Sequence, residues 1–139
     1  MKNGMLRIGK YVIEPSTSVD TLPSEEYNVI NTKNGIVYIS KEPFELSGTK
    51  FWVTIYFKKM HIKKVELSNA TEKYKMNYQT MDSTVLEQLR IENNNFLLNN
   101  LGPAHKENLF GLEYEYSWGK IMTYFDLKSA ETGIVICYF

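Results

Sequence analysis

Cysteine and histidine are the residues that this sequence nearly lacks. Cys137 is the single thiol, so no disulfide can form within the chain. The two histidines, His61 and His105, are far apart, and no HxxxH, HxH or CxxC spacing of a zinc site occurs. Neither a phosphate-binding glycine loop nor a GxSxG nucleophile motif is present. We therefore expect no catalytic residue, no metal and no cofactor.

An excess of charge and a long apolar run are also missing. Sixteen Lys and Arg residues balance sixteen Asp and Glu residues, so no net charge draws the chain toward nucleic acid or an anionic membrane. No stretch approaches the roughly 18 consecutive apolar residues of a membrane-spanning helix. The first residues, MKNGMLRIGKYVIEP, lack the apolar core of a secretory signal. We expect a cytoplasmic protein that binds neither nucleic acid nor membrane.

Apolar and aromatic residues are present in the amounts that a folded domain needs. Hydrophobic residues make up 43% of the sequence and aromatic residues 14%, with ten tyrosines. A chain of this length can bury one hydrophobic core. Tyrosine favours strands and surfaces that are both apolar and hydrogen-bonding. The composition indicates a single domain over residues 1–139.

Alternating apolar residues predict several strands. Residues 5–13 predict a strand that bends at Gly9, and Asn34-Gly35 predicts a tight hairpin turn. Residues 50–68 predict a strand pair, with a turn near Lys58-Lys59. The two faces of its first strand differ: one holds Phe51, Val53, Ile55 and Phe57, and the other holds Trp52, Thr54 and Tyr56. The final stretch, IVICYF, is apolar like a strand covered on both faces, so we expect a buried, inert Cys137.

One long helix is predicted over residues of about 82–101. Asp82, Ser83 or Thr84 can cap its first turn. Its apolar stripe consists of Leu86, Leu89, Phe96 and Leu97. Asn93 interrupts this stripe. Gly102 can adopt the left-handed conformation that ends a helix, and Pro103 prevents its continuation. We expect Leu89 and Phe96 to face a sheet.

Together these elements predict an α+β fold. We expect one mainly antiparallel, twisted sheet of about six to eight strands with the long helix packed on one face. Residues 16–68 and residues 82–139 each read as a helix or helical turn followed by three strands. This similarity suggests a pseudo-repeat within the single domain.

The second half also resembles known proteins. The helix end LGPA, the segment YEYSWGKIMTYFD and the short strand IVICY are similar to the tandem helix-plus-strands proteins of the β-lactamase inhibitor protein type and to small bacterial lipoprotein domains. The chain also looks like small bacterial toxin-immunity proteins. A lipoprotein would need a leader and an acylated N-terminal cysteine, so we favour the inhibitor and immunity groups. The resemblance implies a non-enzymatic bacterial module that binds a toxin or enzyme, and it carries over no catalytic residue.

The candidate binding residues lie where the second half alternates. Leu112, Tyr114, Tyr116 and Trp118 alternate with Glu113, Glu115 and Ser117, so one set packs on the core and the other faces out. Two helical segments cannot cover both faces of a large sheet, so some tyrosines must lie on an open face. Aromatic side chains with polar tips are typical of interface hot spots. The predicted protein-binding residues are Glu113, Tyr114, Glu115, Tyr116, Trp118 and Tyr124.

An alternative is a small enzyme or ligand-binding domain that uses Glu113 and Glu115. Residues two apart on a strand are about 6.6–7 Å apart, which matches the carboxylate separation in inverting glycosidases. Such a pair performs acid–base chemistry when the environments separate the two pKa values. The plainer interpretation is the solvated side of an amphipathic strand. A concave pocket would favour the alternative, and a flat aromatic face would favour the binder.

Overall fold

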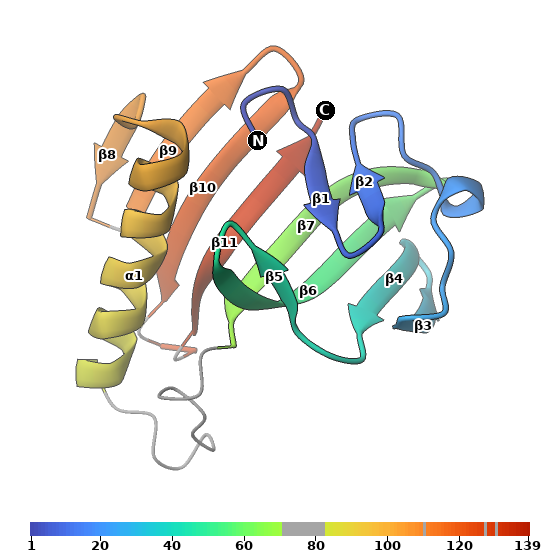
Figure 1. The fold of residues 1–139 in the computed structure, drawn as a ribbon, viewed down its shortest axis with the longest axis horizontal. Helices are drawn as coiled ribbons and strands as arrows, with labels where there is room; N and C mark the ends of the chain where they lie inside the picture. Colours follow the sequence, from blue (N-terminus) through green and yellow to red (C-terminus); the bar gives the residue numbers. More distant parts are fainter. Residues whose placement is uncertain (71–82, 110, 127, 130) are drawn as a thin grey trace.

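The computed structural model describes residues 1–139 except 71–82, 110, 127 and 130. It is an α+β domain in which one helix and one β-hairpin pack on the same face of a large sheet (Figure 1). The elements follow the chain in this order: β1 (Leu6–Ile8), β2 (Tyr11–Ile13), the 3-10 helix η1 (Val19–Thr21), β3 (Tyr27–Thr32), β4 (Gly35–Ser40), β5 (Phe44–Leu46), β6 (Thr49–Lys58), β7 (His61–Asn69), α1 (Ser83–Leu101), β8 (Lys106–Asn108), β9 (Gly111–Tyr116), β10 (Gly119–Asp126) and β11 (Glu131–Tyr138).

The main sheet is antiparallel and has nine strands. Eight of them follow the order β3-β4-β6-β7-β11-β10-β9-β8, and β5 pairs with the first part of β6. The prediction of six to eight strands was too low, because the three-residue strands β5 and β8 are too short to show alternation. Residues 5–13 were also predicted wrongly. They form the separate β1–β2 hairpin, in which Ile8 pairs with Tyr11 across a turn at Gly9.

Two-residue turns join β3 to β4 and β6 to β7. Thr32 pairs with Gly35, so the turn lies at Lys33-Asn34, one residue before the predicted position. Lys59 and Met60, with φ values of 50° and 73°, form the β6–β7 turn. Positive φ at both turn residues matches the right-handed twist of hairpin strands.

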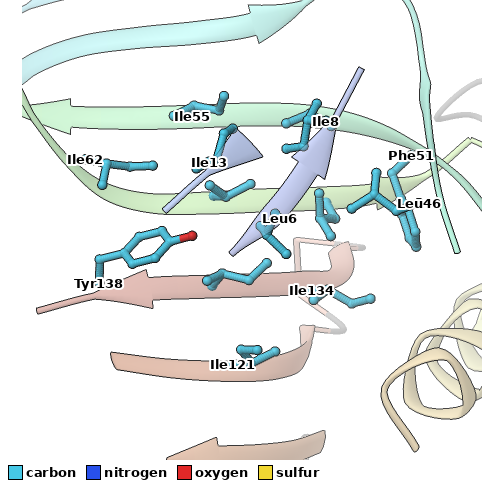
Figure 2. Packing of buried hydrophobic residues seen from close by; sticks show 14 of the residues in the cluster. Leu6, Ile8, Ile13, Leu46, Phe51, Ile55, Ile62, Ile121, Ile134 and Tyr138 are labelled. Carbon is cyan, nitrogen blue, oxygen red and sulfur yellow. The ribbon is translucent and has the colours of Figure 1, made fainter. Parts of the chain in front are cut away.

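The core lies between the sheet and the elements on its inner face. Cross-strand pairing places one row of side chains on this face: Val29, Tyr38, Ile55, Val65, Ile136, Ile121 and Tyr114. All of them except Val29 are buried. Leu6, Ile8 and Ile13 of the hairpin pack over the middle of the sheet (Figure 2). Burial of this apolar surface is the main driving force for the fold.

Helix α1 covers the β9–β10–β11 end of the inner face. Leu89 and Phe96 are buried, as predicted, and the Phe96 ring meets the edge of the Phe51 ring at 5.0 Å between centroids. Gly102 has a φ of 80° and its N–H donates to Leu98 O at 2.9 Å, so the helix ends where expected. The candidate cap Asp82 lies outside the described residues. None of the described helices combines the length and apolarity of a membrane span.

Candidate functional site

The face of the main sheet opposite α1 and the β1–β2 hairpin is the candidate site, and we call it the open face. Strand pairing aligns two rows of its side chains: Ile39, Thr54, Glu66, Val135, Met122 and Glu113 in one, and Val37, Tyr56, Lys64, Cys137, Lys120 and Glu115 in the other. Every one of these side chains keeps part of its surface exposed. The inner row is buried over the same strands, so the described elements that pack on the sheet leave the open face free.

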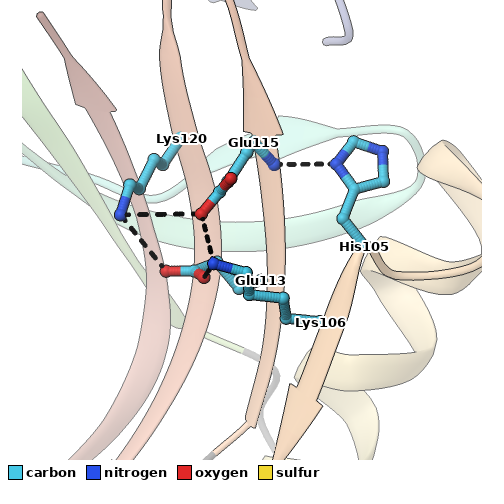
Figure 3. Close-up of polar contacts among 5 residues, drawn as sticks. All are labelled: His105, Lys106, Glu113, Glu115 and Lys120. Carbon is cyan, nitrogen blue, oxygen red and sulfur yellow. Dashed lines mark hydrogen bonds and ion pairs between the residues drawn. The ribbon is translucent and has the colours of Figure 1, made fainter.

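A cluster of two glutamates and two lysines occupies the β8–β9–β10 end of the open face (Figure 3). Lys106 Nζ lies 2.8 Å from Glu115 Oε1 and 3.8 Å from Glu113 Oε2. Lys120 Nζ lies 3.5 Å from Glu113 Oε1 and 4.0 Å from Glu115 Oε1. Behind the cluster, the Glu115 backbone N–H donates to His105 Nδ1 at 2.9 Å. Each carboxylate therefore contacts both lysines, and the charges balance within the cluster.

The contact between Lys106 and Glu115 favours the charged forms of these two side chains. The hydrogen bond and the charge of Lys106 lower the pKa of the Glu115 carboxyl, and Glu115 raises the pKa of the Lys106 ammonium group in return. A general acid at neutral pH needs a carboxyl with a raised pKa. The geometry therefore gives no support to acid–base chemistry at Glu113 and Glu115. Exposed ion pairs of this kind add little stability, so the cluster matters most as a charge pattern on the surface.

Tyrosines and an ion pair form the centre of the open face. The Tyr56 hydroxyl donates to Glu66 Oε2 at 3.2 Å, and Lys64 Nζ lies 3.1 Å from Glu66 Oε1. Lys64 also lies over the Tyr56 ring, 4.4 Å from its centroid, in a cation–π contact. Tyr124 lies beside Gly133, where a Cβ atom would come within 3.0 Å of its ring. Burial and the Glu66 carboxylate raise the pKa of Tyr124 to about 12.

The opposite end of the open face, on β3, β4 and β6, carries exposed apolar side chains next to Asn28 and Thr54. Ile30 pairs with Val37, and Ile30, Ile39 and Trp52 are 47%, 37% and 45% exposed. These side chains were not among the predicted site residues. The signal was present in the sequence, since alternation placed Trp52 on the face opposite Phe51. Exposed apolar residues that lie together mark interaction sites more strongly than scattered ones.

The structure divides the predicted site residues between two faces. Glu113, Glu115 and Tyr124 lie on the open face. Tyr114 is fully buried on the inner face, and its hydroxyl donates to Gly102 O at 2.7 Å. A surface role for Tyr114 was therefore the wrong prediction, because its neighbours on the inner face close over it.

Tyr116 and Trp118 also lie away from the open face. Their rings stack at 5.4 Å between centroids, with an interplanar angle of 6°. Trp118 Nε1 donates to Lys2 O at 2.7 Å, and the Tyr138 hydroxyl donates to Gly4 O at 2.9 Å. These aromatic residues hold the N-terminal segment against the C-terminal strand. Half-buried in that contact, Tyr116 and Trp118 are not available to the surface that carries Glu113 and Glu115.

Cys137 lies in the middle of the open face and is only half-buried, so the expectation of a buried thiol was wrong. Strand β11 is central in the sheet, but only its inner side is covered. Burial raises the pKa of the Cys137 thiol, although Lys64 and Lys120 on the flanking strands act to lower it. Its cross-strand neighbours are these lysines and not a histidine. Within the described residues, no group of three His, Cys, Asp or Glu side chains is placed to hold a metal ion.

Comparison of the chain with protein-family models, curated proteins and solved structures found no match. The resemblance to inhibitor and immunity proteins therefore stays a prediction and assigns no role to any residue. The candidate site rests on its own geometry: a broad sheet face with exposed apolar side chains at one end, two tyrosines at its centre and a balanced charge cluster at the other end.

Proposed function

We propose that the chain is a non-enzymatic protein-binding module that covers another protein with its open face. The observation that carries this proposal is the contrast between the two faces of one sheet. Residues from six adjacent strands are buried on the inner face, whereas their neighbours in the sequence are partly or fully exposed on the open face. A sheet face that carries the exposed side chains of Trp52 and Ile39 and the partly exposed Tyr56 and Tyr124 is typical of an interaction surface.

The two ends of the open face suit different parts of a partner. Trp52, two residues along β6 from the Thr54 that pairs with Ile39, supplies an exposed aromatic anchor of the kind that dominates binding energy. The cluster around Glu113 and Glu115 presents both signs of charge at fixed positions, which orients a partner and sets the association rate. A fitting partner has an apolar protrusion opposite Trp52 and a surface of mixed charge opposite the cluster.

Within this class, an inhibitor or immunity protein that covers a bacterial toxin or enzyme is the function we favour. Such a protein needs surface complementarity and no catalytic group. The balanced cluster fits a target of mixed charge better than a basic nucleic-acid-binding cleft. The alternative, a small enzyme or ligand-binding domain at Glu113 and Glu115, is less well supported, because Lys106 and Lys120 already contact both carboxylates.

We also propose that the two halves form a pseudo-repeat. Strands β3-β4-β6 and β9-β10-β11 each form an antiparallel meander that follows a helical segment. Gly35 and Gly119 occupy matching places in these meanders. Each begins a strand after a two-residue turn, and a Cβ atom there would collide with a backbone oxygen of the next strand, Phe57 O or Cys137 O. Homologous sequences that retain glycine at only one of the two positions would argue against the repeat.

The binding proposal is tested with variants of the open face. The partner is chosen from the products of neighbouring genes or captured by the immobilised protein, and binding kinetics are then measured. Trp52→Ala should weaken binding by about 2 kcal/mol or more, mainly through faster dissociation. Glu113→Ala with Glu115→Ala should change the association rate and its salt dependence. Tyr124→Ala tests the centre of the face.

The matched control is Leu98→Ala, an exposed apolar position on the outer side of α1. This variant should bind like the parent, and denaturant melts should show that all variants remain folded. If the open-face variants also bind like the parent, the open face is not the interface and the proposed function fails.

A further inference from the structure

Asn93 is a buried amide without a hydrogen-bond partner. It lies on the inward stripe of α1, is 1% exposed, and neither its Oδ1 nor its Nδ2 atom has a partner among the described residues. The next residue differs: Asn94 Oδ1 accepts a hydrogen bond from the Thr123 hydroxyl at 2.7 Å. Buried polar groups in native proteins are nearly always paired. Retaining Asn93 in an apolar stripe therefore indicates a partner that the described residues do not supply.

Asn93 lines a cavity of about 240 Å³. The cavity lies between α1, the start of β6 and the end of β7. The cavity is rich in amides, which come from Asn69, Asn93, Asn95, Asn99 and Asn100. Two hydroxyls and the Glu92 carboxylate add further polar atoms, and Phe51 and Phe96 supply the apolar wall. Among the described residues that line the cavity, none is Lys, Arg or His.

This lining selects a particular ligand chemistry. An asparagine side chain donates through its nitrogen and accepts through its oxygen, and a ligand hydroxyl also does both. An anion would meet the Glu92 carboxylate, and the described lining residues include no lysine, arginine or histidine to balance it. A hard cation such as calcium takes six to eight oxygen ligands, and Glu92 is the single carboxylate among the lining residues. Asn69 already donates to Glu92 Oε2 at 3.4 Å, and Asn100 donates to Phe96 O at 2.8 Å. A neutral molecule with several hydroxyls can bond to the amides of Asn93, Asn95 and Asn99 without either penalty.

The size of the cavity limits the ligand further. Pockets for drug-sized molecules have volumes of about 300–1,000 Å³, so a cavity of about 240 Å³ suits a smaller molecule. We propose that this cavity binds a neutral polyhydroxylated ligand of monosaccharide size and that the Asn93 amide recognises its hydroxyl groups. The site lies on the face of the sheet that carries α1, away from the open face, and it is independent of the proposed protein binding.

The test is a titration of the full chain, labelled with ¹⁵N, with single monosaccharides. The probes are glucose, galactose, mannose and N-acetylglucosamine, with gluconate as the anionic control of similar size. We expect at least one neutral sugar to shift the side-chain amide signals of Asn93 and Asn95 in a saturable way, with a dissociation constant of about 1 mM or tighter, the range of a weak specific complex. Gluconate should bind at least tenfold more weakly.

Asn93→Leu keeps the size of the side chain and should weaken the binding of that sugar at least tenfold. The matched control is Gln88→Leu, a polar-to-leucine change at an exposed position of the same helix, and it should bind like the parent. Asn93→Leu should be at least as stable as the parent, because leucine continues the apolar stripe and removes an unpaired amide.

Three results would overturn the proposal. The first is that none of the sugars produces a saturable shift, in which case a buried water molecule would be the partner of the Asn93 amide. The second is equal binding by the parent and Asn93→Leu, or by gluconate and the neutral sugar. The third is a clear loss of stability in Asn93→Leu, since it would show that the amide already makes bonds that the fold needs.

Discussion

Leu97→Ala gives the sharpest test of how α1 is held on the sheet. The Leu97 side chain is 0% exposed and belongs to the core that α1 shares with the sheet. Truncation to alanine removes three carbon atoms from a closed site, and such changes cost about 2–5 kcal/mol. The helix packs against β9, β10 and β11, whose strands are held by their neighbours in the sheet and cannot collapse into a cavity. We therefore expect a loss of about 3–4 kcal/mol, in the upper part of that range.

The assay is urea unfolding followed by circular dichroism and by tryptophan fluorescence. A denaturant slope of about 1–3 kcal/mol per molar urea converts that loss into a midpoint lower by roughly 1–4 M. The adjacent residue supplies the control, because Leu98 is 41% exposed. Leu98→Ala should change the free energy of unfolding by about 0.5 kcal/mol or less, as surface substitutions do.

The comparison of the two variants decides the outcome. If Leu97→Ala costs less than about 1 kcal/mol, the site is not the closed core that the burial indicates. If the two variants lose the same amount, the helix is not docked through the stripe that contains Leu97. Either result would refute the packing of α1 described above, and with it the position of the cavity beside Asn93.

Other predictions concern the tyrosines and the thiol. Tyr114→Phe removes the hydroxyl that donates to Gly102 O and should cost about 1 kcal/mol in urea melts; no loss would mean that water replaces this bond. The free energy of unfolding should fall as pH rises above 10, because burial raises the pKa of Tyr27 and Tyr124 from 10.0 to about 12. In that interval the unfolded chain releases protons that the folded chain retains. Ultraviolet titration of the parent and of Tyr124→Phe checks this, and a Tyr124 that ionises near pH 10 would contradict it. Cys137 should react slowly with a small thiol reagent at neutral pH and faster as pH rises, because its raised pKa keeps the half-buried thiol protonated. A fast reaction at neutral pH would show an activated thiolate instead.

The parts of the fold that follow from local periodicity were predicted from the sequence. Alternation in residues 51–57 separated the inner from the open side of β6, and the 3.6-residue period found α1 and its buried stripe. The end of the helix at Gly102 could also be predicted from the local sequence, since glycine adopts positive φ without strain. Each of these signals depends on neighbouring residues in the chain and needs no knowledge of the tertiary structure.

The choice of face in the segment 112–118 could not be predicted in the same way. Alternation is symmetric, so it shows that Tyr114 and Glu115 point in opposite directions but not which of them is covered. The aromatic content of one side suggested a binding surface, whereas the structure uses Tyr114 in the core and Trp118 to hold the N-terminal segment. The answer depends on α1 and on residues near Lys2, which lie far from this segment in the sequence. The same limit applies to Cys137, whose apolar strand is covered on one side alone.

Trp52 and Asn93 both depart from the pattern of apolar residues inside and polar residues outside, and they lie on opposite faces of the sheet. Trp52 is a large aromatic residue exposed on the open face, and Asn93 is a residue of α1 whose amide is buried on the inner side of the helix. Local rules are broken most often where function requires it, so each position is a candidate for selection on binding. Distant sites without shared contacts contribute independently to the free energy. Asn93→Leu should therefore leave protein binding by the open face unchanged, and Trp52→Ala should leave sugar binding unchanged. If either variant altered both activities, the sheet would have to couple its two faces, and the open face and the cavity could no longer be treated as separate sites.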